Sequence, residues 1–318
     1  MTALADAAPL QEGPPPTARG GRLARAAAAW VDAPPFSQAV GLLLGTLSAS
    51  IIVLLVTLVL ISPIQHFTAQ TGLFDRFRLT LAEGSVPVGP VTNTGDIVDP
   101  GTPIAMFTAP AVSVSEEIIV QGTAGAETMQ GIGHRRDTPL PCQPGTSVLM
   151  ARAAAYGGVG GRWTQLQTGD QISVTTGQGT CTYTVTGQRR AGDPAPAAPT
   201  SGNGSLVLTT AAGLPFMPNE VLRIDAILTG TAFEAAADVL PSAALPPAEK
   251  AMAVDDSIGV LFGLVLLLEL LVAAVIAATY AWRRWNAWQT WVFAVPVLAA
   301  LAVITANAVN QLLLPNLL

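Results

Sequence analysis

Three long apolar runs constrain this chain more than any other feature of its sequence. Half of the 318 residues are apolar and only 11% are charged, well below the ~25% charged residues typical of a soluble domain. The apolar excess is concentrated in the three runs, and each is near or above the ~20 residues that a helix needs to cross a bilayer. We therefore predict three transmembrane helices, over residues 37–62, 257–282 and 289–315.

The first run has a second interpretation, as a cleaved signal peptide. Its apolar core is longer than the ~7–15 residues of a signal sequence, and 36 residues precede it. No small-x-small cleavage site follows at residues 62–66. We therefore expect a retained signal anchor.

Basic residues set the expected orientation. The N-terminal tail, residues 1–36, carries three arginines and is otherwise rich in Ala and Pro without periodicity, so we expect it to be partly disordered. The loop at 283–288 begins with two more arginines. The positive-inside rule assigns both segments to the cytoplasm. We expect a multi-pass plasma-membrane protein with residues 63–256 and the C-terminus outside.

The outer segment is predicted to hold one all-β domain. Residues 104–230 contain short β-branched or alternating runs separated by Gly, Pro and Asp, and this length suffices for one core. Phe74 to Leu81 alternates like a strand, so residues 63–103 are expected to form an extended connector. Residues 231–256, rich in Ala and Pro, are expected to be a linker.

The charge and residue content of the outer segment exclude several functions. It carries 17 acidic and 10 basic residues, a net charge of −7, which gives no reason to expect nucleic-acid binding. The segment has two histidines, and neither aligns with the expected site, so we expect no zinc cluster. No glycine-rich phosphate loop stands out. We therefore expect neither a metal nor a cofactor.

Four consecutive blocks of the outer segment carry a family resemblance. Residues 103–110 look like an opening strand, and 118–123 (Ile-Ile-Val-Gln-Gly-Thr) resemble Val-Val-Val-Glu-Gly-Thr. Residues 131–134 followed by 139–145 resemble Gly-Pro-Gly-His and Leu-Pro-Gly-Gln-Pro-Gly, and 166–174 resemble Leu-x-x-Gly-Asp-x-Ile-x-Val. Together the four blocks resemble the sortases, which are cysteine transpeptidases, and the actinobacterial class E type in particular. The resemblance implies an all-β sortase-like barrel outside the membrane, plus the three transmembrane α-helices.

Sortase chemistry needs three side chains, and the resemblance locates their positions. A Cys thiolate attacks a peptide carbonyl, a His acts as acid and base, and an Arg stabilises the oxyanion. The Cys position holds Ala211, and the Arg position holds Val221. The His position falls on Arg152, or on Ala151 if the register shifts by one. Because alanine has no nucleophile and arginine stays protonated, we expect a pseudoenzyme rather than an enzyme.

Other residues of the region are candidates for a binding groove. Arg223 shares a strand face with Val221 and is expected to reach the oxyanion region. Thr209 lies beside Ala211, but the sequence shows no base to activate it. His134 matches a non-catalytic His of the family, so a structural role is favoured over a catalytic one. The groove is expected to bind an extended peptide, since strand addition needs no nucleophile.

The only cysteines, Cys142 and Cys181, both fall in the outer segment. An oxidising compartment permits a disulfide between them, and two free thiols there would be liable to oxidation. A displaced nucleophile at Cys142 and a redox switch are the alternatives. We expect a structural disulfide.

The membrane helices carry their own signals. Gly41, Gly45 and Ala49 form a small-xxx-small stripe that favours packing against a second copy or another protein. Glu269 lies near the middle of the second helix, where a charge is costly unless it is protonated or paired. Its expected partners are two polar residues of the third helix, Asn307 and Asn310, or a residue of another subunit.

These patterns together predict a membrane-anchored, sortase-like pseudoenzyme. We expect it to act as a scaffold, assembly or peptide-binding subunit of a cell-envelope complex, with other membrane or envelope proteins or a second copy as partners. An active cysteine transpeptidase with relocated catalytic residues is one alternative. An accessory subunit of a transporter or secretion machine is the other.

Overall fold

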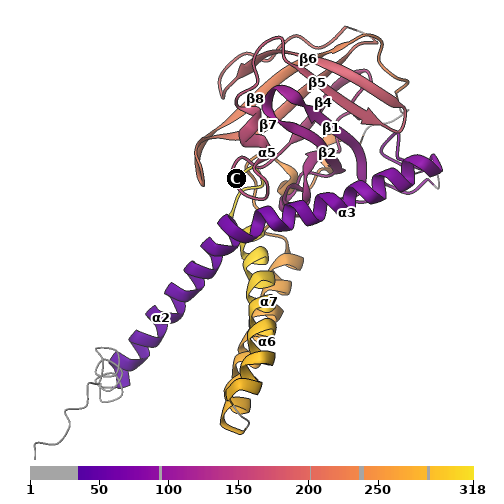
Figure 1. Ribbon diagram of the computed structural model, residues 1–318. Helices are drawn as coiled ribbons and strands as arrows, with labels where there is room; N and C mark the ends of the chain where they lie inside the picture. Colours follow the sequence, from indigo (N-terminus) through magenta and orange to yellow (C-terminus); the bar gives the residue numbers. More distant parts are fainter. Residues whose placement is uncertain (1–34, 93–94, 201, 236–239, 285–286) are drawn as a thin grey trace, which may run out of the picture. The chain divides into compact units, whose positions relative to one another are not determined.

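The computed structural model describes residues 35–92, 95–200, 202–235, 240–284 and 287–318. The chain divides into two compact units, Met1–Ile51 and Ile52–Leu318. The predicted cytoplasmic tail over 1–36 lies almost wholly outside the described residues, and the predicted loop at 283–288 lies partly outside them. The second unit contains a β-barrel and the helices that follow it (Figure 1).

The β-domain is a closed barrel, which confirms the predicted all-β fold. Its strand order is β1-β2-β3-β4-β7-β8-β6-β5. β2 pairs with β3, and β4 with β7, in parallel, whereas the other neighbours are antiparallel. The strands are β1 (Pro103–Ala109), β2 (Val114–Gln121), β3 (Ile132–His134), β4 (Gly145–Met150), β5 (Gln171–Thr176), β6 (Gly179–Arg189), β7 (Gly204–Leu214) and β8 (Met217–Thr229).

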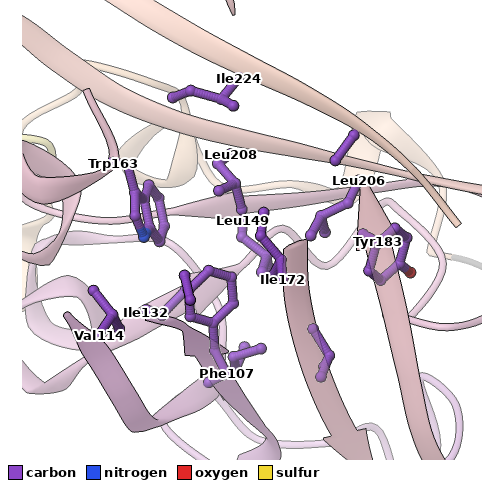
Figure 2. Packing of buried hydrophobic residues seen from close by; sticks show 14 of the residues in the cluster. Phe107, Val114, Ile132, Leu149, Trp163, Ile172, Tyr183, Leu206, Leu208 and Ile224 are labelled. Carbon is purple, nitrogen blue, oxygen red and sulfur yellow. The ribbon is translucent and has the colours of Figure 1, made fainter. Parts of the chain in front are cut away.

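Alternating side chains explain both the strands and the core. On β5, and on β6 as far as Val185, every second residue is buried, as expected for a strand with one face inside a barrel. Figure 2 shows the resulting core, in which Phe107 and Trp163 lie with ring centroids 5.6 Å apart. Ile172, Leu208 and Ile224 complete it from neighbouring strands. Two short helices, α4 (Gly125–Gln130) and α5 (Val159–Trp163), lie in the connections between strands.

Within the described residues, three helical stretches are long and apolar enough to cross a membrane: Ser48–Glu83, Ile258–Ala281 and Trp288–Leu313. The first of these stretches contains the end of α2 (Pro35–Val56), a π-helical turn (Thr57–Ile61) and α3 (Ser62–Glu83). The other two belong to α6 (Ile258–Arg284) and α7 (Ala287–Leu313). Pro63, at the start of α3, cannot donate a backbone hydrogen bond to the preceding turn, which accounts for the π-helical turn there.

The extended connector predicted over residues 63–103 is wrong in its first half, because α3 continues as a helix to Glu83. The buried residues of α3 include His66, Leu73 and Phe77, which recur at helical rather than strand spacing. The apolar alternation from Phe74 to Leu81, which suggested a strand, is a short part of this helical stripe of buried residues. The stripe packs α3 against the barrel, where Leu73 and Phe77 join the cluster around Ile118.

The predicted linker over residues 231–256 is tied to the barrel. It contains two 3₁₀ turns, Ser242–Ala244 and Pro247–Glu249. Glu249 is buried and paired with Arg136, and its carbonyl accepts a hydrogen bond from the Thr123 hydroxyl (2.7 Å). The chain therefore approaches α6 along the barrel surface.

Candidate functional site

The predicted site positions meet where β4, β7 and β8 lie side by side. Ala211 of β7 pairs directly with Val221 of β8. The N–H of Ala151, just after β4, donates to the carbonyl of Thr209 on β7 (3.2 Å), and Arg152 is the next residue. The fold therefore brings together Ala211, Val221 and Arg152, which are far apart in the sequence.

Side chains at this place point away from the barrel core. Leu208 and Leu222 belong to the core cluster, and side chains alternate along a strand, so their neighbours on β7 and β8 face outward. We call the surface made by the outward side chains of β4, β7 and β8 the outer face. Its members at this end are Val148, Met150, Thr209, Ala211, Val221 and Arg223.

A segment from beyond the last membrane-span candidate covers the outer face. We call residues 314–318, which follow α7, the exit segment. Leu317 is completely buried against Met150 and Ala211, and its carbonyl accepts a hydrogen bond from the N–H of Ala153 (2.9 Å). Ala211 is consequently only 1% exposed although it faces out of the barrel.

Arg152 is a buried cation held by backbone carbonyls. Its guanidinium donates to the carbonyls of Gly125 (3.2 Å) and Pro315 (3.4 Å) and lies 5.2 Å from the centre of the Tyr156 ring. Burial lowers the pKa of Arg152 to about 10, so the side chain stays protonated at neutral pH. A permanent cation does not shuttle protons, but it can hold a main-chain carbonyl, and here it holds one of the exit segment.

Tyr156 connects the same loop to α7. Its hydroxyl donates to Oδ1 of Asn307 (3.0 Å) and accepts from Nδ2 of Asn310 (3.1 Å). Burial raises the pKa of Tyr156. The two asparagines therefore have a partner other than Glu269, which is exposed on α6. Their i, i+3 spacing puts both on one face of α7, and that face meets the barrel.

The other groove candidates are divided between two places. Arg223 lies opposite Thr209 on the outer face, as expected from its strand position. His134 instead lies on β3, where its ring nitrogens are 2.8 Å from Oε1 of Gln121 and 3.0 Å from the carbonyl of Pro139. Burial lowers the pKa of His134 to about 4, so the ring is neutral at pH 7. This environment fits the structural role favoured for it.

The predicted disulfide between Cys142 and Cys181 is confirmed, with a Cα–Cα distance of 5.8 Å. It joins the loop before β4 to β6. The N–H of Cys142 also donates to the hydroxyl of Tyr183 (2.6 Å), whose pKa burial raises to about 12. Both cysteines of the chain are consumed in this bond.

Open space remains beside the covered site. A cavity of about 450 Å³ extends from Ala211 along the β7–β8 hairpin. Its walls include Leu318 of the exit segment and two basic side chains, Arg162 and Arg190. Within the described residues, no group of three or more His, Cys, Asp or Glu side chains is placed to hold a metal ion.

Sequence reasoning missed Tyr156, Asn316 and Leu317 as site residues. Residue 315 was assigned to the third transmembrane helix, and that helix ends at Leu313 instead. A proline shortly after an apolar helical run is an end signal, and Pro315 supplied it. The hydrogen bonds of Tyr156 depend on long-range packing, so no local pattern marks them.

The stripe predicted at Gly41, Gly45 and Ala49 stays a prediction. All three residues lie in α2. Ala49 is exposed, whereas the packing of Gly41 and Gly45 lies outside what the structure describes.

Comparisons with known proteins give one family. Residues 107–217 match the Sortase domain. No curated protein matches the chain. Similar solved structures include a sortase D5 transpeptidase of Clostridium perfringens (17% identity, 51% of this chain and 99% of that chain, TM-score 0.42). Sortase A of Corynebacterium diphtheriae (15%, 53% and 90%, 0.38) and sortase E of Streptomyces avermitilis (20%, 48% and 100%, 0.34) are others.

The match of residues 107–217 to the Sortase domain contradicts the prediction that this chain is not an enzyme, because sortases are transpeptidases. That prediction depended on short sequence blocks, which locate a strand but do not establish which side chains act. The assignment of the catalytic positions to Arg152, Ala211 and Val221 stays a prediction. What the comparison shows is that residues 107–217 match the Sortase domain, in a chain whose described residues include three helices long and apolar enough to cross a membrane.

Proposed function

We propose that this protein is a membrane-anchored sortase-domain subunit of a cell-envelope complex, in which it acts as a scaffold or assembly factor and binds an extended peptide. In this proposal the protein lies in the plasma membrane. The N-terminus faces the cytoplasm, and the barrel and the C-terminal segment lie outside. The partners are other membrane or envelope proteins, or a second copy of the chain.

One observation carries the proposal, the attachment of α7 to the barrel at the predicted site. Tyr156 is hydrogen-bonded to two asparagines of α7, and Arg152 is hydrogen-bonded to the carbonyl of Pro315. A helix that only anchors a domain needs no polar contact with its site loop. These bonds instead support a function in which a membrane helix and the outer face act together.

The outer face supports the peptide-binding part of the proposal. The loop after β4 already holds another segment of the chain, since the N–H of Ala153 donates to the carbonyl of Leu317 (2.9 Å), within the turn formed by residues 315–318. A main-chain hydrogen bond combined with a pocket for one apolar side chain is the usual basis of strand-type peptide recognition. Two basic side chains, Arg162 and Arg190, line the adjoining cavity, where Arg190 is paired with Glu220 (3.4 Å).

The test is the size of the particle in native membranes. The full chain is extracted in mild detergent, and its mass is compared with the 32.6 kDa of the single chain. We expect a larger complex, and we expect Asn310→Leu to reduce its yield because Tyr156 then loses its donor on α7. Thr279→Val, on the exposed side of α6, is the control and should leave the complex intact. A single chain in mild detergent and in intact membranes alike contradicts the proposal.

Peptide transpeptidation is the second candidate, and the Sortase domain match favours it. A thiol mechanism in this chain requires the Cys142–Cys181 bond to be opened by a dithiol, which is oxidised as the two thiols form. Cleavage of a peptide library by the full chain, with an amine acceptor, should then depend on the reductant. The Cys142→Ala/Cys181→Ala variant, shown to be folded by its melting transition, should lose activity if a cysteine is the nucleophile and keep it if another group is.

A further inference from the structure

The last three residues of the exit segment are as buried as the core residues of the barrel. Leu317 and Asn316 are fully buried and Leu318 is 3% exposed. Leu313, only a few residues earlier at the end of α7, is 62% exposed. The change from exposed to buried therefore occurs within a few residues, where the chain leaves the candidate membrane span and reaches the outer face.

Polar contacts fix the segment in one register. The N–H of Asn316 donates to the carbonyl of Ala253 (2.8 Å). Its side-chain amide is within hydrogen-bonding distance of three carbonyls, those of Thr123 (2.7 Å), Lys250 (2.9 Å) and Ala248 (3.3 Å). These carbonyls belong to the barrel and to the chain that leads into α6, so one side chain joins three parts of the fold.

The apolar contact lies at the centre of the predicted site. Leu317 belongs to one buried cluster with Met150 and Ala211, and the half-buried Val221 and Met252 pack around it. Covering these side chains removes apolar surface from water and is favourable in itself. The outer face is consequently closed to solvent at the position where sequence reasoning located the nucleophile of the family.

We propose that the exit segment is an intramolecular occupant of the outer face, which a peptide ligand must displace before it can bind. The ligand-binding part of this inference rests on the proposed function; the occupancy does not. Because the segment follows α7 directly, and because Tyr156 holds Asn307 and Asn310 of that helix, displacement transmits ligand binding on the barrel to a membrane helix.

The contacts also define the ligand that fits. A competing segment places an aliphatic side chain over Ala211 and offers a main-chain carbonyl to the N–H of Ala153. Its preceding residue supplies an amide donor to the carbonyls that Asn316 now occupies. The chemical class is therefore an aliphatic peptide with a carboxamide side chain that can adopt a turn like that of residues 315–318.

The test measures access to the outer face in the full-length chain, in lipid nanodiscs. Ala211→Cys is labelled with a hydrophilic maleimide, with Leu214→Cys as the accessible reference, because Leu214 is 71% exposed. We expect labelling at position 211 to be at least ~10-fold slower than at position 214. Adding Leu317→Ala should raise the rate at position 211 about tenfold or more, while Leu313→Ala, the matched control, leaves it unchanged.

Equal rates at positions 211 and 214 in the otherwise unaltered chain overturn the occupancy, and so does a rate that Leu317→Ala does not change. The probe for displacement is a synthetic Leu-Pro-Asn-Leu-Leu peptide, with a scrambled peptide as control. It should bind the Leu317→Ala chain more tightly than the unaltered chain. Faster labelling without any peptide binding supports the occupancy and refutes the peptide-binding part of the proposed function.

Discussion

Loss of the Cys142–Cys181 disulfide should lower the free energy of unfolding by an amount set by the number of residues between the two cysteines. The bond joins residues 39 positions apart. Closing a loop of this length reduces the conformational entropy of the unfolded chain, which by the chain-entropy relation stabilises the folded state by about 4 kcal/mol at 25 °C. In a unit of this size 1 kcal/mol corresponds to about 2–4 °C in melting temperature. Removing the bond should therefore lower the melting temperature by about 8–16 °C.

Scanning calorimetry of the full chain in detergent measures this shift directly. Cys142→Ala/Cys181→Ala should melt about 8–16 °C below the unaltered chain, and a dithiol reductant should lower the melting temperature of the unaltered chain by a similar amount. Alanine is chosen because both cysteines are buried, and a serine hydroxyl there would add an unsatisfied polar group.

The control is the double variant with reductant, whose melting temperature should not change. A shift of less than about 3 °C on removal of the bond refutes the chain-entropy reasoning. A reductant effect that persists in the double variant shows that the reductant acts elsewhere.

Three further predictions concern buried contacts. Gly157→Ala should cost at least ~2 kcal/mol in denaturant unfolding, because a Cβ there meets the His66 ring at 2.4 Å and the backbone φ is +86°; an unchanged midpoint contradicts this. Asn316→Asp should cost ~3 kcal/mol or more, since it directs a carboxylate at carbonyls that now accept hydrogen bonds. The near-neutral control is Asn203→Asp, because the half-buried Asn203 uses its side-chain oxygen only as an acceptor, from the N–H of Gly204 (2.9 Å), and a carboxylate keeps that role. Burial lowers the pKa of His134 from 6.5 to about 4. Between these two pH values the histidine is protonated in the unfolded state but neutral in the folded state. The contribution of His134 to the free energy of unfolding should be fully present above pH 6.5 and fall by about 3 kcal/mol towards pH 4. His134→Gln should remove this pH dependence of the free energy of unfolding; an identical pH dependence in the variant contradicts the assignment.

Local patterns predicted the parts of this fold that depend on local physics. Apolar runs long enough to cross a bilayer became the candidate spans of α6 and α7, and alternation identified the barrel strands. The cysteine pair could be predicted because Cys142 and Cys181 had no other partner of their kind. Each of these inferences needed only residue type and spacing.

The predictions for α3 and for the partners of Asn307 and Asn310 were wrong for one physical reason: both depend on tertiary contacts between segments that are distant in the sequence. The helix α3 was predicted as extended because its stripe, which includes His66 and Phe77, has meaning only against the barrel surface. Asn307 and Asn310 were paired with Glu269 because all three lie in apolar runs, yet their actual partner is Tyr156 of a loop about 150 residues earlier. Spacing within a helix shows which residues share a face, but not which surface that face meets.

The central claim is that residues after α7 occupy the outer face of the sortase domain. The most direct measurement is oxidative cross-linking in intact membranes of the full chain carrying Ala211→Cys and Leu317→Cys. Because these residues belong to one buried cluster, the account predicts rapid, nearly complete cross-linking within the chain. The pair Leu214→Cys and Leu313→Cys, both exposed, is the control and should cross-link little. Failure of the first pair to form a bond while the protein keeps its Cys142–Cys181 disulfide would contradict the account.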